Sequence, residues 1–381
     1  MSATTSKTTS PTKLDVPLLD LKTQYAALKT EIMPVVERIL DSQYMINGPE
    51  VGELECAAAG YCQTKFAVGC SSGTDALILS MMALGLKPGD EIITSPFTFF
   101  ATVGSIHRQG LKPVFVDIDP DTLNLDADQL EQAVTEKTRA IMPVHLFGQM
   151  ADMDTVLDVA EKHDLKTIED AAQAIGAKQN DAPAGSLSDA GCFSFFPSKN
   201  LGGAGDGGLI TTQDEDLYKR LLMLRNHGAH ERYYHDEVGG NFRLDTLQAA
   251  YLSVKLKHLE TWHEGRRKNA AYYDKHLAEV NEVTTPVIAE GNQSIYNQYT
   301  LRVQQRDTLQ KYLGEAGVGS AIYYPLCMHE QKCFSYLNHH TGDFPVAEQA
   351  ASEVLSIPIY PELKEEQLAH VVETIKQFYA G

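Results

Sequence analysis

Residues 194–208 read SFFPSKNLGGAGDGG, in which a single lysine, Lys199, stands between an apolar run and a glycine-rich loop. Lysines in contact with water usually lie on polar helix faces. A lysine that is partly removed from water has a lowered pKa and becomes an amine nucleophile. The segment alone leaves two interpretations open, a reactive amine in a closed site or an ordinary surface lysine in a loop.

Two clusters upstream of Lys199 place polar groups at predicted strand ends. The sequence SSGT at 71–74 follows an apolar run and opens a helical pattern, where backbone N–H groups can bind an anion. Asp170, within IEDAAQ at 168–173, closes another predicted strand, and ligands of parallel sheets bind at the carboxyl ends of the strands. Each cluster also has a plain structural explanation, because small residues suit turns and a strand-end aspartate can cap the next helix.

Short apolar runs alternate with longer helical patterns from residue 65 onward. We expect strands at 66–70, 91–94, 113–116, 140–144, 166–169, 191–196 and 208–212. This alternation predicts an α/β fold whose large domain holds a doubly wound, mostly parallel sheet.

The second half of the chain predicts a smaller α+β domain. A helical pattern at 244–277 is expected to link the two domains, followed by strands at 299–303 and 319–323 and helices at 307–316 and 363–379. We therefore predict a disordered tail at 1–13, a large domain at 14–262 and a small C-terminal domain at 263–381.

Composition excludes several classes of function. The chain has 32 Lys and Arg against 51 Asp and Glu, and its net charge of −19 disfavours nucleic acid and anionic membranes as partners. Its six cysteines show neither a C-x-x-C pair nor zinc-site spacing, which predicts reduced thiols and no metal. Without a signal peptide or an apolar run of about 20 residues, we expect a cytoplasmic protein.

Three segments resemble the sugar aminotransferases of the DegT/DnrJ/EryC1/StrS family. They are IEDAAQAIG at 168–176, SFFPSKNLGGAGDGG at 194–208 and GNFRLDTLQA at 240–249, and the resemblance covers nearly the whole chain. It implies the aspartate aminotransferase-like fold of pyridoxal phosphate (PLP) fold type I, with PLP as the cofactor. It also implies transamination with L-glutamate as the amino donor.

The resemblance assigns roles around the cofactor ring. Lys199 matches the lysine that binds PLP covalently, Asp170 matches the carboxylate at the pyridine nitrogen, and Gln173 matches the residue beside the ring hydroxyl. Phe99 matches the aromatic residue that stacks on the ring, although a core phenylalanine is the alternative. An aspartate at the pyridine nitrogen makes the cofactor an electron sink.

The resemblance also assigns ligands of the cofactor phosphate. Gly73 and Thr74 match backbone ligands, and Ser194 matches a hydroxyl donor. Asn241 matches a residue that reaches the phosphate of a partner subunit, which implies an obligate homodimer with two shared active sites. A turn asparagine is the alternative for Asn241.

Four residues are implied for the nucleotide-sugar substrate. Arg243 matches a position that meets a substrate carboxylate from the partner subunit, with an exposed arginine as the alternative. Tyr323, Tyr324 and His329, in IYYPLCMH at 322–329, are candidate sugar contacts, or else pack at the domain interface. Cys327 and Met328 depart from the usual filling of this loop, which leaves the shape of the pocket open.

The residues beside Lys199 bear on the position of amination. In the family, C-4 aminating members tend to have His after the lysine and a GEGG loop, whereas this chain has Asn200 and GDGG at 205–208. That pattern resembles C-3 aminating members, above all enzymes of UDP-2-acetamido-2-deoxy-3-keto-glucuronate in cell-surface polysaccharide biosynthesis. The alternatives are a dTDP-3-keto-6-deoxyhexose substrate and a non-catalytic PLP-binding regulator.

Overall fold

Seven strands form the central sheet of the computed structural model, which describes residues 14–381 and so leaves the tail predicted at 1–13 outside the described residues. They are β1 (Phe66–Cys70), β2 (Glu91–Thr94), β3 (Lys112–Phe115), β4 (Thr138–Ile141), β5 (Lys166–Asp170), β8 (Ala190–Ser194) and β9 (Gly208–Thr212). Their order is β1-β9-β8-β5-β4-β2-β3. In this sheet β9 pairs antiparallel with β1 and β8, and the other neighbours pair in parallel. The mostly parallel α/β sheet predicted from the sequence is confirmed.

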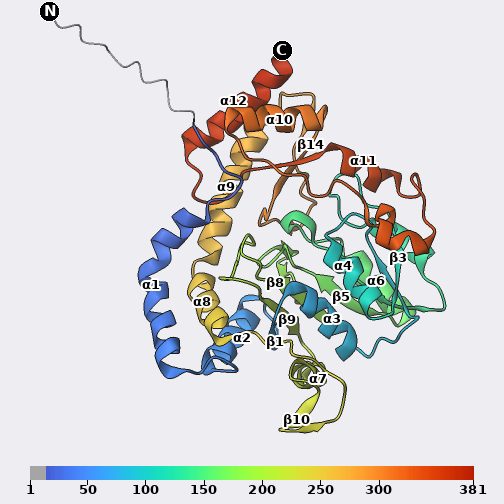
Figure 1. Cartoon of the computed structure of the whole chain (residues 1–381). Coiled ribbons are helices and arrows are strands. Elements are labelled where there is room, and N and C mark those ends of the chain that lie inside the picture. The colour runs from blue at the N-terminus through green and yellow to red at the C-terminus, as the bar shows by residue number, and fades with distance from the viewer. Residues whose placement is uncertain (1–13) are drawn as a thin grey trace, which may run out of the picture.

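Helices cover both faces of this sheet (Figure 1). One face packs against α3 (Gly73–Ala83), α4 (Phe100–Arg108) and α7 (Glu215–Arg225), and the other against α2 (Pro49–Tyr61), α6 (Met153–His163) and α8 (Thr246–Leu256). Because successive strand residues point to opposite faces, Ile92 packs with the first layer and Ile93 with the second. This arrangement leaves the carboxyl ends of the parallel strands available for a site.

The C-terminal part is built on a three-stranded antiparallel sheet of β12 (Val283–Thr284), β14 (Tyr299–Val303) and β15 (Val354–Ile357). Helices α9 (Leu259–Leu277), α10 (Arg306–Ala316) and α12 (Glu365–Ala380) pack on it around a separate hydrophobic cluster. Val16, from the other end of the chain, is fully buried in the same cluster. Its N–H donates to Gly317 O (2.8 Å), and its carbonyl accepts from the N–H of Gly319 (2.8 Å).

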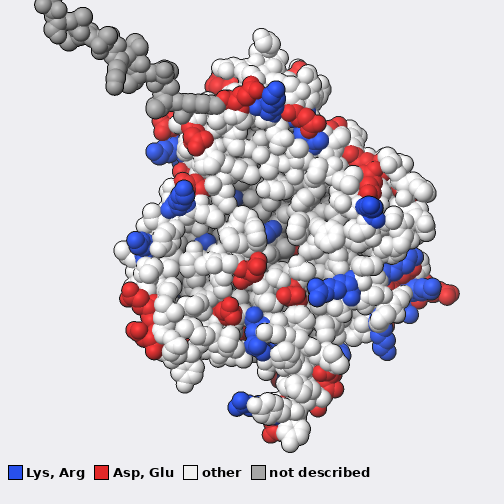
Figure 2. All heavy atoms as spheres, viewed as in Figure 1, with Lys and Arg blue, Asp and Glu red and all other residues white. Residues whose placement is uncertain are grey.

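The remaining elements are short or peripheral. They are α1 (Leu21–Ser42), α5 (Leu130–Ala133), α11 (Pro345–Glu353), β6 (Lys178–Gln179), β7 (Ala182–Pro183), β10 (Ala229–Glu231), β11 (Tyr234–His235), β13 (Asn292–Gln293) and the 3₁₀ turns Ala127–Gln129, Leu146–Gly148, Met328–Glu330 and Lys332–Leu337. Acidic and basic side chains are interspersed over the face drawn in Figure 2. No helix within residues 14–381 has the length and apolar character to cross a membrane.

Two predicted elements differ in the structure. The single helix expected at 244–277 is divided into α8 and α9 by a turn at Lys257 and His258, because α8 packs on α1 and α2 whereas α9 packs on α12. The strand expected at 319–323 is a loop with one isolated bridge, between Ala321 and Ser356. The division near Trp262 stays a prediction.

Candidate active site

A cavity of about 420 Å³ lies at the carboxyl ends of the parallel strands. Most residues that the sequence singles out line it, namely Gly73, Thr74, Phe99, Asp170, Gln173, Ser194, Lys199, Tyr323 and Tyr324. They come from the ends of β5 and β8, from the start of α3, from the residue before α4 and from a C-terminal loop. The fold therefore gathers side chains from distant parts of the sequence around one space.

Lys199 lies in the loop that follows β8. A hydrogen bond from its own N–H to Phe196 O (2.8 Å), and one from the N–H of Gly203 to Phe195 O (2.7 Å), fix the loop backbone on either side of the lysine. Burial lowers the pKa of Lys199 to about 8, and the charge of Asp170 opposes this shift. The amine is thus held in the desolvated environment that nucleophilic amine chemistry requires.

Asp170 ends β5 and is 5 % exposed. Its Oδ2 accepts a hydrogen bond from Thr102 Oγ1 (2.7 Å), and its Oδ1 accepts one from the N–H of Ala172 (3.3 Å). Burial raises the pKa of Asp170, while the hydrogen bond from Thr102 and the charge of Lys199 act in the opposite direction. The hydrogen bonds and the charge of Lys199 thus offset part, but not all, of the cost of burying an ionised carboxylate at the cavity.

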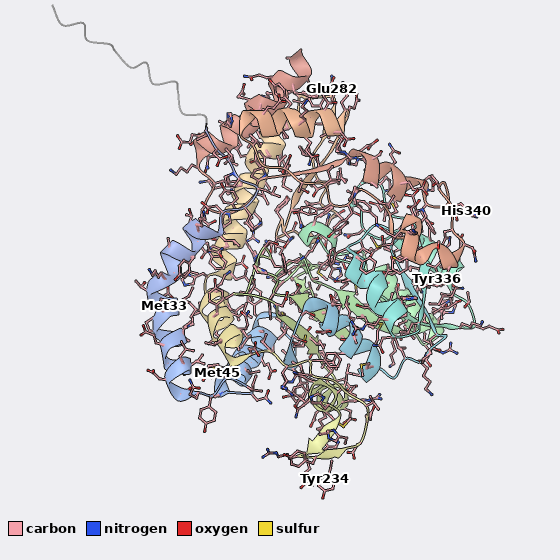
Figure 3. All side chains as sticks on the ribbon, viewed as in Figure 1. Met33, Met45, Tyr234, Glu282, Tyr336 and His340 are labelled. Atoms are coloured by element: carbon pink, nitrogen blue, oxygen red, sulfur yellow. The ribbon has the colours of Figure 1, made fainter. Side chains whose placement is uncertain are left out.

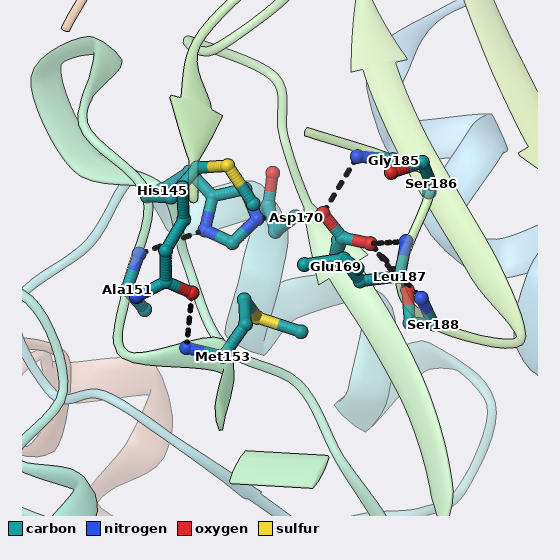
Figure 4. A network of polar contacts seen from close by, with 12 residues as sticks. His145, Ala151, Met153, Glu169, Asp170, Gly185, Ser186, Leu187 and Ser188 are labelled. Carbon is teal, nitrogen blue, oxygen red and sulfur yellow. Dashed lines mark hydrogen bonds and ion pairs between the residues drawn. The ribbon is translucent and has the colours of Figure 1, made fainter. Parts of the chain in front are cut away.

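A second buried hydrogen-bond network, formed by His145 and Glu169, adjoins Asp170 (Figure 4). His145 Nδ1 accepts from the N–H of Ala151 (3.1 Å), so the proton on its Nε2 is donated to Glu169 Oε2 (2.8 Å). The N–H of His145 also donates to the carbonyl of Asp170 (3.0 Å). Although burial opposes it, the hydrogen bond from His145 and those from Gly185 and Ser188 lower the pKa of Glu169. The network anchors the strand end that carries Asp170.

The turn between β1 and α3 forms another wall of the cavity. Ser72 caps α3, and its Oγ accepts from the N–H of Asp75 (3.0 Å). A Cβ on Gly73 would lie 2.6 Å from Cβ of Ser194, so only glycine allows this close approach. The first N–H groups of α3 have no intrahelical acceptor and carry the positive end of the helix dipole, which suits a phosphate.

Aromatic side chains border the same space. Phe99 is 55 % exposed, and its ring centroid lies 6.0 Å from that of Tyr324. Gln173 connects two elements, because its Oε1 accepts from the N–H of Phe147 (2.7 Å) and its Nε2 donates to the hydroxyl of Tyr324 (3.1 Å). Tyr323 lines the cavity beside Tyr324.

Three predicted site residues lie outside this cavity in the single chain. His329 is 3 % exposed, and its Nε2 pairs with Glu348 (3.0 Å) away from the cavity lining. Asn241 is exposed, and Arg243 donates to Asn226 Oδ1 (2.8 Å). The roles expected of Asn241 and Arg243 in a partner's site, and of His329 as a sugar contact, stay predictions.

The sequence reasoning overlooked Thr102, His145 and Glu169. Thr102 lies within α4, and His145 lies between β4 and a 3₁₀ turn, so neither belongs to the motifs at 168–173 or 194–208. Glu169 does lie in a motif, and its place beside Asp170 at a strand end was an available signal.

Comparisons with known proteins all point to one family of aminotransferases. Residues 26–376 match the DegT/DnrJ/EryC1/StrS aminotransferase family. The chain is 51 % identical to a "Pleiotropic regulatory protein" of Geobacillus stearothermophilus, over 96 % of this chain and 99 % of that protein. It is 43 % identical to the UDP-N-acetyl-3-dehydro-alpha-D-glucosamine 3-aminotransferase of Acidithiobacillus ferrooxidans, over 96 % and 98 % of the two chains.

A further relative is the UDP-2-acetamido-2-deoxy-3-oxo-D-glucuronate aminotransferase of Pseudomonas aeruginosa, which is 44 % identical over 91 % of this chain and 96 % of that enzyme. Among solved structures, Streptomyces venezuelae DesV in complex with a ketimine intermediate superposes with a TM-score of 0.94. It is 40 % identical, over 96 % of this chain and 98 % of that one. The chain therefore belongs to the DegT/DnrJ/EryC1/StrS aminotransferase family and has PLP fold type I.

Proposed function

We propose that this aminotransferase uses PLP to transfer an amino group from L-glutamate to C-3 of a UDP-linked 2-acetamido-3-keto-sugar, with the glucuronate as the expected acceptor. The observation that carries the proposal is one cavity lined by Lys199, Asp170 and Gln173 beside the glycine turn at Gly73. A lysine, a strand-end carboxylate and an anion-binding turn are the three groups that PLP chemistry needs from a protein.

The cavity residues fit PLP by their own chemistry. The turn at Gly73 and the hydroxyl of Ser194 would hold the phosphate, where a Cβ on Gly73 would clash with Ser194. Asp170 would meet the protonated pyridine nitrogen, Gln173 would lie near the ring hydroxyl, and the exposed ring of Phe99 would stack on the cofactor. Bound PLP supplies the electron sink for the transamination.

Lys199 supplies the base of the reaction. A fall in its pKa from the ordinary 10.5 to about 8 raises the fraction of neutral amine near pH 7 roughly 300-fold. Its Nζ would then accept a proton from one carbon and return it to another within the cavity. Asp170 is held in place by hydrogen bonds from Thr102 and Ala172, and a protonated pyridine nitrogen beside it would offset the cost of burying its carboxylate.

C-3 amination and the UDP-linked acceptor are supported by sequence and relatives. Asn200 follows Lys199, and its Nδ2 donates to Ile295 O (3.1 Å) where C-4 aminating members tend to have histidine. Both aminotransferase relatives described above bear names of UDP-linked 3-keto-sugar substrates, one neutral and one a uronate. The uronate proposal rests on Arg243, whose guanidinium would meet the sugar carboxylate from the partner subunit.

The proposed homodimer is supported by the surface of this chain. Asn241 is exposed, and α1 and the loop after it expose apolar side chains, with Leu40 at 46 % and Tyr44 at 68 %. Figure 3 shows Met33 on the outer side of α1 and Met45 in the same region. Exposed apolar side chains gathered on one helix and its loop are typical of a protein interface.

A regulatory role is the second candidate, because the relative with 51 % identity is named for regulation. A regulator that only bound PLP would have no need of a lysine with a lowered pKa, and this chain retains Lys199, Asp170 and Gln173 around one cavity. Catalysis is therefore the stronger proposal.

A coupled assay of 2-oxoglutarate release from L-glutamate tests both the catalytic and the regulatory candidate. The panel holds UDP-linked 3-keto uronate, UDP-linked 3-keto-N-acetylglucosamine, a 4-keto-sugar and a dTDP-3-keto-6-deoxyhexose. We expect turnover with the UDP-linked 3-keto-sugars. Turnover with the 4-keto-sugar alone would refute C-3 amination, and turnover with none would favour the regulatory candidate.

A further inference from the structure

A smaller hollow of about 100 Å³ adjoins the active-site cavity. The two spaces share the lining residues Ser198, Gln298 and Tyr323. Arg266, from α9, lines the hollow but not the active-site cavity. A guanidinium therefore lies next to the active site without belonging to the cavity around Lys199.

Arg266 is almost completely buried, with 4 % of its surface exposed. One of its terminal nitrogens donates to the carbonyls of Tyr296 (2.9 Å) and Asn297 (3.4 Å), and its Nε has no hydrogen-bond partner. Among residues 14–381, no carboxylate lies within 4.0 Å of its nitrogens. A buried charge without a counter-ion is costly, so a site of this kind favours an anion.

Lys255 adds to the positive charge in the same region. It is 2 % exposed, and its Nζ donates to the carbonyl of Gly202 (2.6 Å), in the loop that carries Lys199. Burial lowers the pKa of Lys255 and of Arg266, and Glu362 is the acidic group that opposes both shifts. Since Glu362 forms no ion pair with either side chain in the described chain, the two buried cations remain only partly compensated.

The active-site cavity itself offers few cations to a substrate. Among the described residues, Lys199 is the one lysine or arginine that lines it. Its amine is needed for the proposed reaction and is therefore not available to bind a substrate carboxylate. L-Glutamate brings two carboxylates into a protein whose net charge is −19. A local guanidinium offsets the repulsion that such a ligand meets, and its planar fork suits a carboxylate.

We propose that the hollow is a carboxylate subsite in which Arg266 binds one carboxylate of the amino donor L-glutamate. The inference rests on the proposed function and adds to it a donor-binding residue. The hydroxyls of Ser198 and Tyr323, which form no hydrogen bond with other described residues, lie at the passage between the two spaces and are available to the same carboxylate.

The test measures binding of glutarate, an unreactive dicarboxylate, to the PLP-loaded protein by titration calorimetry. Wild type should bind it, and Arg266→Gln should bind it about 10- to 100-fold more weakly, since a hydrogen bond to a charged group contributes about 1.5–3 kcal/mol. Arg266→Lys should lose less. Arg267→Gln is the matched control, because Arg267 pairs with Glu260 (2.5 Å) outside the hollow and its loss should leave glutarate binding unchanged.

A second variant guards against misfolding of the arginine variants. Leu19→Phe adds volume at the lining of the hollow while leaving Arg266 and the active-site cavity intact, and it should also weaken glutarate binding. If Arg266→Gln and Leu19→Phe both bind glutarate as wild type does, the subsite is refuted. If Arg266→Gln leaves glutarate binding unchanged and raises only the KM of a uronate sugar, the carboxylate belongs to the acceptor, and the proposal is likewise refuted.

The donor half-reaction separates this inference from the proposed function. Wild type should lose the yellow absorbance of bound PLP on addition of L-glutamate. If wild type shows no such loss, the proposed function fails. If wild type reacts and Arg266→Gln reacts with the same dependence on glutamate concentration, only the subsite fails.

Discussion

Replacing Glu169 by glutamine should destabilise the protein more than any exposed carboxylate change, although Glu169 does not face the cofactor cavity. Its Oε2 accepts from His145 Nε2 (2.8 Å) and the N–H of Gly185 (2.6 Å). Its Oε1 accepts from the N–H of Leu187 (3.1 Å) and from the N–H (3.1 Å) and hydroxyl (2.8 Å) of Ser188. In glutamine one of these two oxygens is replaced by an NH₂ group, which donates hydrogen bonds. Whichever oxygen is replaced, at least two of the surrounding buried donors lose their acceptor.

The size of the loss follows from those donors. Each buried donor left without an acceptor costs about 1–3 kcal/mol, so the free energy of unfolding should fall by about 2–6 kcal/mol. Urea unfolding followed by circular dichroism measures it, with Glu53→Gln as the control because Glu53 is exposed. We also expect weaker PLP binding, since the network anchors the strand end of Asp170. A fall of less than about 1 kcal/mol relative to wild type would refute this reasoning.

The same substitution has a pH signature. Despite the opposing effect of burial, hydrogen bonds from His145, Gly185 and Ser188 hold the pKa of Glu169 below its ordinary 4.5. A depressed carboxyl pKa contributes stability that is present above pH 4.5 and is lost as the pH falls through the folded-state pKa. The stability difference between wild type and Glu169→Gln should therefore be full at neutral pH and shrink on acidification below pH 4.5. A difference that grows on acidification would contradict the assignment.

Four further predictions concern the active site directly. Lys199→Ala should abolish transamination and the yellow absorbance of the PLP adduct, and retention of full activity would overturn the central proposal. Gly73→Ala should weaken PLP binding by at least about 10-fold in a fluorescence titration, because its Cβ would lie 2.6 Å from that of Ser194. Arg243→Ala should raise the KM of a uronate acceptor more than that of a neutral sugar, and equal effects would refute the carboxylate contact. Gel filtration should give a mass near two chains, and a monomer at micromolar concentration would contradict a site shared through Asn241.

Much of the fold could be predicted because the relevant signals are local. The run at 166–169 is short, contains the β-branched residues Thr167 and Ile168 and is followed by a carboxylate, and the structure forms β5 there. The division of the helix at Lys257 and His258 could not be predicted, because no proline or glycine marks it and it arises from packing of α8 and α9 on different helices. The strand expected at 319–323 failed because Ala321 bridges to a single residue, Ser356.

The residues of the candidate site also differ in how far the sequence alone reveals them. Lys199 and Asp170 lie in segments whose sequence alone suggests chemistry, and the structure brings them to one cavity. Thr102 and His145 are single residues in ordinary surroundings, and only tertiary contact with Asp170 gives them a role. Arg266 lies in a charged helical pattern typical of a solvated face, so its burial could not be inferred from α9 alone.

The packing of Val16 into the C-terminal cluster has a consequence for synthesis. A ribosome makes Val16 roughly 300 residues before Val318, its partner in the parallel bridge. The central sheet can pair while the nascent chain is still growing, but the segment around Val16 must wait for the last quarter of the chain. Its docking closes a very long loop, and such contacts form late in folding. Docking of this segment is therefore expected to be a late step of folding, after the central sheet has paired.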